Sequence, residues 1–299
     1  MKEVAFYIMN SKGYYVLKNF INKFGCKCIT YIVSSEDKNI QKDFFDEIKL
    51  LAEKEKLKFF HRSESEKIAL IENYFDGYKF AIGWRWLIEN EKNLIVFHDS
   101  LLPKYRGFSP LVNCLINGEK VVGVTALFAS PEYDKGDIIS QKSLNIEYPI
   151  KIIEAIQKIE PLYFDLVDEI YSKIQNNCEL IGSKQDESLS TYSIWLEKDD
   201  YFIDWSWSAE KIKRFVDATG YPYDNAKAYL NGKIIKIIDV EVEKNIVVEN
   251  RERHIGKVIF IKEKTPIVVC GDGLVVLKDF RDEYNNKITI NFRSKFKGK

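Results

Sequence analysis

A histidine and two aspartates in turn-rich segments are the residues of this chain best suited to chemistry. One segment runs from His98 to Gly107 and reads HDSLLPKYRG, and the other runs from Tyr133 to Asp137 and reads YDKGD. An imidazole can take up and return a proton near neutral pH, and a carboxylate within reach favours its charged form and fixes its orientation. The two segments predict an enzyme in which His98 moves protons and either Asp134 or Asp137 is its partner.

The place of His98 in the chain supports this interpretation. It follows the apolar run 94–97, which predicts a strand, and open α/β sheets bind their ligands at the carboxyl ends of strands. A lone histidine at this point would more simply cap the strand. The prediction of a site therefore depends on what surrounds it.

The segment 99–107 combines backbone shape with positive charge. A proline and a glycine shape the loop, and Lys104 and Arg106 supply the charge. The loop leads into Ser109-Pro110, which suits the N-cap and first turn of a helix, and a helix start attracts anions. We expect Lys104 and Arg106 to hold a substrate diphosphate; the alternative is that they are surface charges beside a turn.

Both segments resemble the signature of the 10-formyltetrahydrofolate-dependent formyltransferases, in which His-x-Ser-Leu-Leu-Pro and a later Asp-x-Gly-Asp define the active site. The resemblance extends to GWR at 83–85, DWS at 204–206 and ATGYPY at 218–223, and it covers 81–233. It implies a doubly wound, Rossmann-like α/β formyltransferase domain, 10-formyltetrahydrofolate as the formyl donor, and a homodimer.

The resemblance also implies a role for individual residues. His98 and Asp134 are implied to be catalytic, because they lie 36 residues apart, the separation usual in the family, which leaves Asp137 to cap the turn. The residues implied to bind the donor are Gly83, Trp84, Arg85, Trp86, Leu87 and Asp137. Those implied to bind the substrate are Ser100, Lys104, Arg106, Gly107, Asn113, Tyr221 and Tyr223.

Some of these assignments have a structural alternative. Ser100 shapes its loop rather than acting as a nucleophile, since an activated formamide needs no acyl-enzyme. Without the family resemblance, a pair of core residues and a donor-binding loop are equally good interpretations of Trp84 and Trp86. Tyr221, Tyr223 and Trp205 either stack on a nucleotide base or belong to the core.

One residue departs from the family pattern. Members usually carry Asn two residues before the histidine, where its amide holds the developing oxyanion, and this chain has Val96 there. Three groups are candidates to replace it: the Asn113 side chain, a backbone N–H of the Ser100 loop, or protonated His98 itself. The alternative is a non-catalytic protein that binds folate or a nucleotide sugar.

Composition excludes several classes of protein. The chain has 299 residues, 45% of them hydrophobic, which is enough for about two domains. It has no apolar run long enough to span a bilayer and no leader pattern, so we expect a cytoplasmic protein with no membrane partner. Five cysteines without paired Cys-x-x-Cys spacing predict neither a disulfide framework nor a metal site. With 45 basic and 45 acidic residues, nothing points to nucleic acid. The absence of Gly-x-Gly-x-x-Gly argues against a dinucleotide.

Alternating apolar runs and helical patterns predict two domains, a catalytic domain over 1–190 and a small β-rich domain over 191–299. The predicted strands are 4–9, 28–33, 58–60, 80–83, 94–97, 123–129, 138–146, 226–230, 233–242, 258–261, 267–270, 274–280 and 288–290. The predicted helices are 14–24, 44–55, 151–174 and 209–218, the third kinked or split at Pro161 and the fourth capped by Ser208. Residues 182–190 read as a linker and the tail 293–299 as a solvated terminus.

The function predicted from these observations is formyl transfer to an amino group of a nucleotide-linked deoxysugar, for surface glycan synthesis such as lipopolysaccharide or O-antigen. Methionyl-tRNA formyltransferase is the alternative within the family, and it needs a basic surface for phosphates. Residues 191–299 hold 20 Lys and Arg against 17 Asp and Glu, a net charge of +3, and the last nine residues alone contribute four positive charges. The domain is otherwise about neutral, which disfavours tRNA.

Overall fold

The computed structural model describes residues 2–298, so the predicted features that fall on Met1 and Lys299 lie outside the described residues. The chain forms two compact units. The first comprises the chain up to Leu111 together with Val121–Asn145 and Ile156–Ile194, and the second comprises Val112–Lys120, Ile146–Ala155 and the chain from Trp195 onward. Two internal segments, Val112–Lys120 and Ile146–Ala155, thus belong to the second unit. The domain limits predicted from the sequence, 1–190 and 191–299, place both segments in the first domain.

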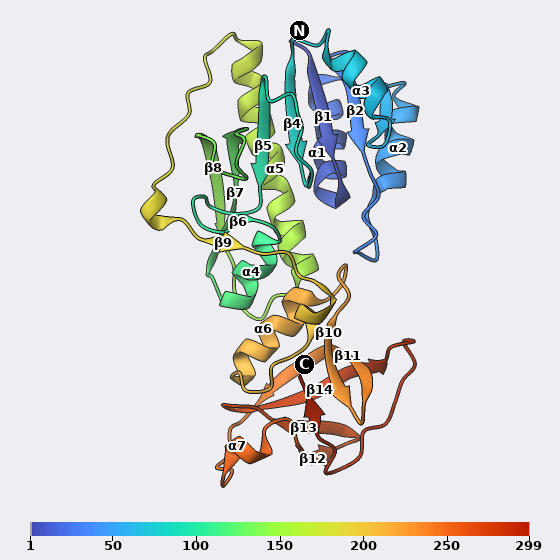
Figure 1. Cartoon of the computed structure of the whole chain (residues 1–299), viewed down its shortest axis with the longest axis vertical. Helices are drawn as coiled ribbons and strands as arrows, with labels where there is room; N and C mark the ends of the chain where they lie inside the picture. The colour runs from blue at the N-terminus through green and yellow to red at the C-terminus, as the bar shows by residue number, and fades with distance from the viewer. Residues whose placement is uncertain (1, 299) are drawn as a thin grey trace. The chain divides into compact units, whose positions relative to one another are not determined.

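The first unit is built on a seven-stranded sheet in the order β3-β2-β1-β4-β5-β7-β8 (Figure 1). The strands are β1 Val4–Ile8, β2 Ile29–Ser34, β3 Phe59–His61, β4 Tyr78–Ile82, β5 Leu94–His98, β7 Val121–Phe128 and β8 Ile138–Asn145. The first five are parallel, β7 runs antiparallel to β5, and β8 runs antiparallel to β7. This confirms the predicted doubly wound α/β architecture, in which the carboxyl ends of parallel strands meet at one edge.

Helices alternate with these strands: α1 Asn10–Phe24, α2 Phe45–Lys54, α3 Ser65–Glu72, α4 Pro110–Asn117 and α5 Ile152–Gln175. The helix α3 was not predicted. Of the kink or split predicted at Pro161, the split is wrong, because α5 is one helix with Pro161 inside it. Proline removes one backbone hydrogen bond, but the apolar stripe of α5, including Ile159 and Tyr163, is fully buried and outweighs that loss.

The two faces of the sheet bury different residues. On one face Phe6 of β1 meets Phe20 of α1 at a ring-centroid distance of 5.0 Å. On the other, Ala81 and Val96 pack with Trp84, from the loop after β4, in a second cluster. Because side chains alternate along a strand, His98 belongs to the same face as Val96.

The second unit is a six-stranded sheet in the order β12-β13-β14-β11-β10-β15 covered by α6 Ala209–Thr219 (Figure 1). Its strands are β10 Ala226–Leu230, β11 Lys233–Glu243, β12 Val258–Lys262, β13 Thr265–Val269, β14 Leu274–Asp282 and β15 Phe296–Lys297, and a short helix, α7 Arg251–His254, precedes β12. The predicted N-cap is confirmed, since the Ser208 hydroxyl accepts from Lys211 N at 3.2 Å.

Two predictions for the second unit are wrong. Residues 288–290 form no strand, and the tail is not solvated along its length, because Phe296 lies in β15. Phe296 is 1% exposed and stacks on Trp205 at 5.2 Å, which also makes Trp205 a core residue. The basic residues around Phe296 dominate the local composition and predict an exposed tail, although the ring of Phe296 is buried.

The segment predicted to be a linker is instead held against the His98 loop. Within the first unit, β6 Arg106–Gly107 pairs with β9 Tyr192–Ser193 as a two-stranded parallel ladder. A short 3-10 turn, Glu187–Leu189, precedes β9, and another, Lys198–Tyr201, follows it. We call residues 183–193 the strap. No helix among residues 2–298 is long and apolar enough to cross a membrane.

Candidate active site

His98 and Asp134 lie together at the carboxyl end of β5. The Nδ1 atom of His98 is 3.5 Å from Oδ1 of Asp134, and both side chains are nearly buried. The Nε2 atom of His98 lies 2.8 Å from the carbonyl oxygen of Tyr105. A carbonyl only accepts, so Nε2 carries a hydrogen, and in the neutral ring Nδ1 is the nitrogen that can receive a proton.

The other carboxylate oxygen of Asp134 ties its loop to the His98 loop. Asp134 Oδ2 accepts from the backbone N–H of Gly107 at 2.8 Å. Asp134 itself has a φ of 56°, a left-handed conformation that aspartate tolerates better than most residues. One carboxylate thus orients the imidazole and fixes the distance between two loops.

The loop after His98 is held by its own hydroxyl and amide groups. Ser100 is 1% exposed, and its hydroxyl donates to the Lys104 carbonyl at 2.7 Å. Thr125 donates to the Ser100 carbonyl at 2.6 Å, and Gln141 donates to the Leu102 carbonyl at 2.9 Å. The Ser100 side chain therefore shapes the loop, and its hydroxyl is committed to backbone.

Arg106 and Lys104, predicted as a pair, have different surroundings. Lys104 is exposed, whereas Arg106 is fully buried. The guanidinium of Arg106 donates to Gln185 Oε1 at 3.0 and 2.8 Å and to both carboxylate oxygens of Glu187 at 2.9 and 2.7 Å. Its bond to Glu187 raises the pKa of Arg106. Arg106 is thus neither a surface charge nor a free anion ligand; it anchors the strap.

Gln185 is a site residue that the sequence interpretation missed. Its Nε2 atom donates to the carbonyl oxygens of Asp134 and Gly136 at 2.7 and 2.8 Å, while its Oε1 accepts from Arg106. No side chain fits at Gly136, since an added Cβ would lie 1.7 Å from the Phe128 carbonyl oxygen. The only signal in the sequence was a polar stretch, which also describes an ordinary linker.

The predicted donor-binding loop follows β4. Trp84 and Trp86 meet edge to face at 5.2 Å, and Trp84 also contacts Tyr7 at 5.3 Å. The indole N–H of Trp84 is buried and has no hydrogen-bond acceptor among residues 2–298. Arg85 forms an ion pair with buried Asp37. Leu87 is 59% exposed. The side chain of Arg85 is therefore engaged within the fold, whereas that of Leu87 is open to solvent.

The remaining predicted residues lie elsewhere. Asn113 belongs to α4, and its contacts place it in the second unit with Tyr221 and Tyr223. Tyr221 is 46% exposed. Asp137 accepts from Phe128 N through its carbonyl at 3.0 Å, so its backbone closes the turn between β7 and β8.

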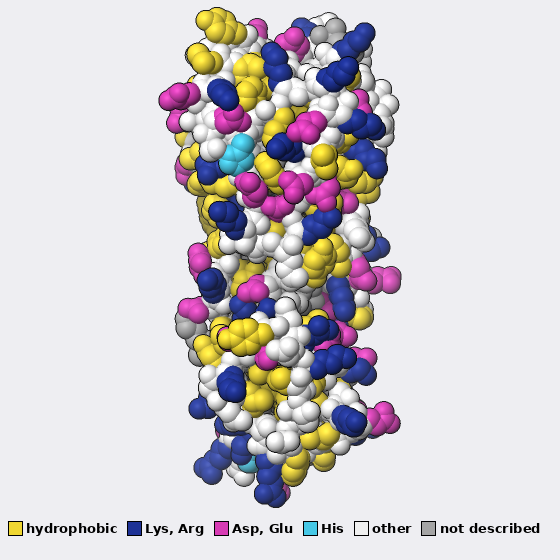
Figure 2. Space-filling model, turned by 90° about the vertical axis from the view of Figure 1, so that its right-hand side faces the viewer, with side chains coloured by type: hydrophobic (Ala, Val, Ile, Leu, Met, Phe, Trp, Pro, Cys, Tyr) yellow, Lys and Arg dark blue, Asp and Glu magenta, His cyan; other side chains and the backbone are white. Residues whose placement is uncertain are grey.

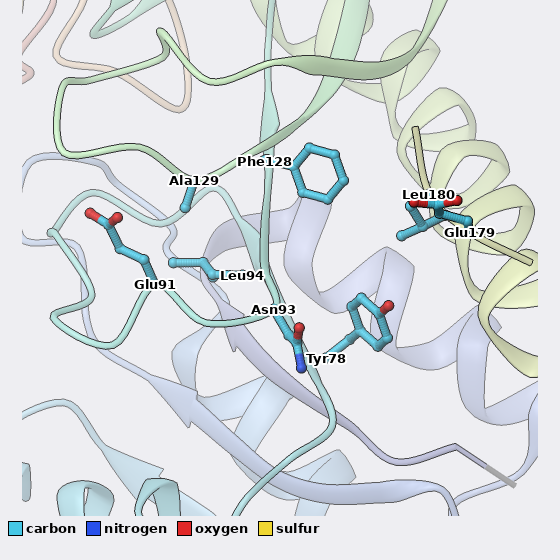
Figure 3. A pocket seen from close by; sticks show the side chains of 8 residues that line it. All are labelled: Tyr78, Glu91, Asn93, Leu94, Phe128, Ala129, Glu179 and Leu180. Carbon is cyan, nitrogen blue, oxygen red and sulfur yellow. The ribbon is translucent and has the colours of Figure 1, made fainter. Parts of the chain in front are cut away.

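The described residues offer no metal cluster, and a cavity lies away from His98. Among the described residues no group of three His, Cys, Asp or Glu side chains could hold a metal ion, and all five cysteines are free. A cavity of about 330 Å³ (Figure 3) is lined by Tyr78, Glu91, Asn93, Leu94, Phe128, Ala129, Glu179 and Leu180. Tyr78 and Leu94 begin β4 and β5, so this cavity lies at the amino ends of the strands, the opposite edge from His98.

A doubly wound sheet that carries a histidine–aspartate pair at the carboxyl end of a strand, with an appended antiparallel β domain, defines a class of group-transfer enzyme. Two family models match this chain, "Formyl transferase" over residues 73–159 and "Formyl transferase, C-terminal domain" over residues 196–296. A methionyl-tRNA formyltransferase from Thermotoga neapolitana is 31% identical over 241 residues, 79% of this chain and 72% of that protein. The chain belongs to the formyltransferase family and is a formyl-transferring enzyme.

Relatives and solved structures agree on the fold. Six other methionyl-tRNA formyltransferases align over only 57% to 62% of their own lengths. The structure of WlaRD, a sugar 3N-formyl transferase with dTDP and 5-N-formyl-THF, has a TM-score of 0.66 at 18% identity and covers 96% of this chain and 99% of that one. An N-formyltransferase from Helicobacter canadensis, with folinic acid and dTDP-3-aminofucose, has a TM-score of 0.66 at 17% identity and covers 93% and 99%.

Proposed function

We propose that this chain transfers a formyl group from 10-formyltetrahydrofolate to an amino group of a nucleotide-linked amino-deoxysugar, as a step in surface glycan synthesis, and that it works as a homodimer. The observation that carries the proposal is the His98–Asp134 pair at the carboxyl end of β5 in a chain of this family. The folate donor is supported by the two structural neighbours, which hold formyl-THF and folinic acid.

We propose one role for each residue of the His98–Asp134 pair. His98 Nδ1 receives the proton that the attacking amine loses and returns it to the leaving folate nitrogen. Asp134, 3.5 Å from that atom, stabilises the charged ring between the two transfers and keeps it turned toward the loop. No covalent intermediate on the protein is required, which agrees with a Ser100 hydroxyl already committed to backbone.

The acceptor is proposed from the structural neighbours and from charge. The alignments with the two sugar N-formyltransferase structures cover 99% of those chains, which supports a nucleotide-linked sugar as the acceptor. Acidic and basic side chains are interspersed over most of the face in Figure 2, with basic ones more frequent toward its lower end. A tRNA substrate requires many neutralised phosphates. A nucleotide sugar needs few cations, and exposed Lys104 is our proposed diphosphate contact.

The remaining ligand contacts are proposed from the same family pattern. The donor would lie against the loop Gly83–Leu87 and near Asp137. The acceptor would meet the His98 loop at Gly107. Asn113, Tyr221 and Tyr223 belong to the second unit, and their role in binding the acceptor stays a prediction from the sequence. Arg106, buried under the strap, supports this loop from beneath without touching the substrate.

Turnover tests the proposal directly. The protein is incubated with 10-formyltetrahydrofolate and a panel of nucleotide-linked 3-amino and 4-amino deoxysugars, and release of tetrahydrofolate is followed by absorbance. Methionyl-tRNA is run beside them as the competing acceptor. Turnover with one sugar and none with tRNA is the expected result. Turnover with methionyl-tRNA alone would overturn the sugar assignment, and donor binding without any turnover would favour a non-catalytic protein.

A further inference from the structure

The side chain of Asn10 occupies the space beside Gly83. Asn10 is the first residue of α1, directly after β1, and has a φ of 54°. A Cβ atom added to Gly83 would lie 2.6 Å from Nδ2 and 3.0 Å from Oδ1 of Asn10. Gly83 itself has a φ of 62°, which also favours glycine. Because Gly83 has no side chain, the Asn10 carboxamide fits beside it.

Two connections link this carboxamide to the end of the sheet that carries His98. The parallel register of β4 and β5 ends with the pair Ile82 and Phe97, and Gly83 and His98 are the residues that follow this pair. The second connection runs through Lys12, whose backbone N–H donates to Asn10 Oδ1 at 3.2 Å. The Lys12 ammonium group forms a nearly buried ion pair with Asp99, the residue after His98.

Asn10 has an amide donor to spare. Its Oδ1 is used by Lys12, but its Nδ2 has no hydrogen-bond acceptor among residues 2–298. Three other side-chain donors near the two loops, those of Ser100, Gln141 and Gln185, are committed to backbone carbonyl oxygens. An unused N–H at the carboxyl end of a sheet, beside a proton-transfer residue, is placed as a donor to developing negative charge.

We propose that the Asn10 amide is the hydrogen-bond donor that holds the formyl oxygen during transfer; this assignment rests on the proposed function. The acceptor amine forms a bond to the formyl carbon while the carbonyl electron pair moves onto oxygen, where Asn10 Nδ2 donates to it. The amine's proton passes to His98. The pair then returns to reform the carbonyl, the bond from carbon to the folate nitrogen breaks, and His98 delivers the proton to that nitrogen. Val96, on the same face, has no donor for this task.

Two substitutions separate the amide from the backbone. Asn10→Asp keeps the acceptor for Lys12 N and the left-handed conformation but removes the N–H donor. Asn10→Gly keeps the conformation and removes the side chain without adding charge. Asn231→Asp and Asn231→Gly are matched controls, because Asn231 is exposed in the turn before Gly232 and also has a positive φ, 50°.

We expect both Asn10 variants to lose about 10²- to 10³-fold in kcat with little change in KM for the donor, since the contact strengthens only in the transition state. The Asn231 variants should keep wild-type rates. A wild-type kcat in Asn10→Gly would overturn the proposal. A loss of kcat in Asn10→Asp alone would then come from the carboxylate charge that this variant introduces. A raised donor KM with unchanged kcat would overturn the proposal as well.

A second measurement does not depend on the acceptor. A stable donor analogue with a ¹³C-labelled formyl group on nitrogen 10 is bound to wild type and to both variants, and its carbonyl stretch is read by infrared difference spectroscopy. A hydrogen bond lowers the stretch, so both variants should show a higher frequency than wild type. Equal frequencies would overturn the role of Asn10 even if no sugar is turned over. If wild type binds no analogue, the proposed function fails first, and this inference falls with it.

Discussion

The imidazole of His98 is held between two oxygen acceptors, Asp134 Oδ1 at 3.5 Å from Nδ1 and the Tyr105 carbonyl at 2.8 Å from Nε2. The second bond fixes the ring tautomer, so the nitrogen that can change its protonation is the one that faces the carboxylate. The pair is thereby set to accept a proton at a single, defined position.

His98→Asn should abolish transfer while leaving ligand binding nearly intact. Loss of a positioned acid–base group costs about 10²- to 10⁴-fold in rate. Steady-state kinetics with the best acceptor, together with donor affinity by calorimetry, provide the measurement. Retained activity would remove His98 from the mechanism.

Asp134→Asn should lower kcat strongly, and Glu132→Gln should not. The asparagine keeps an oxygen for the Gly107 N–H but loses the charge that faces His98, so we expect a fall of about 10²-fold or more in kcat. Glu132 is the matched control, an exposed carboxylate two residues before Asp134 in the same turn. Equal losses in the two variants would show that the turn, and not the charge of Asp134, is what matters.

Arg106→Lys should destabilise the first unit, whereas Lys104→Ala should not. Lysine cannot reproduce the fork that bonds both Gln185 and Glu187, so the buried cation would lose hydrogen bonds, for about 2 to 3 kcal/mol of lost unfolding free energy. Lys104 is exposed, so its removal should change stability by less than about 0.5 kcal/mol and raise KM for the nucleotide sugar. Urea unfolding and acceptor kinetics give the two readouts. An unchanged midpoint for Arg106→Lys would contradict the anchoring role.

Gln185→Glu should slow turnover without changing KM for the donor. The variant still accepts from Arg106 but places a carboxylate against the Asp134 and Gly136 carbonyl oxygens, where the amide donated two bonds. We expect a loss of about 10-fold in kcat, because small displacements of a positioned group reduce rates steeply. The pH profile of kcat should shift as well, a change that a purely structural role would not produce. Wild-type kcat and pH profile together would exclude Gln185 as a positioning residue.

Glu169→Gln should destabilise the protein at neutral pH but not in strong acid. Hydrogen bonds from Lys173 and Lys142 lower the pKa of Glu169 to about 2. A lowered carboxyl pKa stabilises the fold above the unfolded value of about 4.3, and this contribution is lost as the pH falls toward 2. For a partly exposed pair we expect about 1 kcal/mol at pH 7. Denaturant unfolding from pH 7 to pH 3 should show the gap to wild type narrowing. Glu66→Gln, at an exposed position of α3, is the control; a constant gap would contradict the assignment.

Local patterns were sufficient for the architecture. The alternating strands and helices of the first unit, the β-rich second unit and the Ser208 cap all follow from the spacing of apolar and capping residues within a few positions. The spacing of two turn-rich segments also brought His98 and Asp134 into consideration, and the structure places them in contact.

Tertiary structure alone decided what surrounds these two residues. Arg106 reads as a surface cation until the strap, 79 to 81 residues away in the chain, brings Gln185 and Glu187 over it. Asn10 looks like an ordinary helix start in the sequence, and only the fold shows that its amide lies beside Gly83, at the end of the sheet that carries His98. Sequence spacing specifies contacts along one element, whereas which distant elements share a buried edge depends on how the whole sheet packs, and no local pattern encodes that.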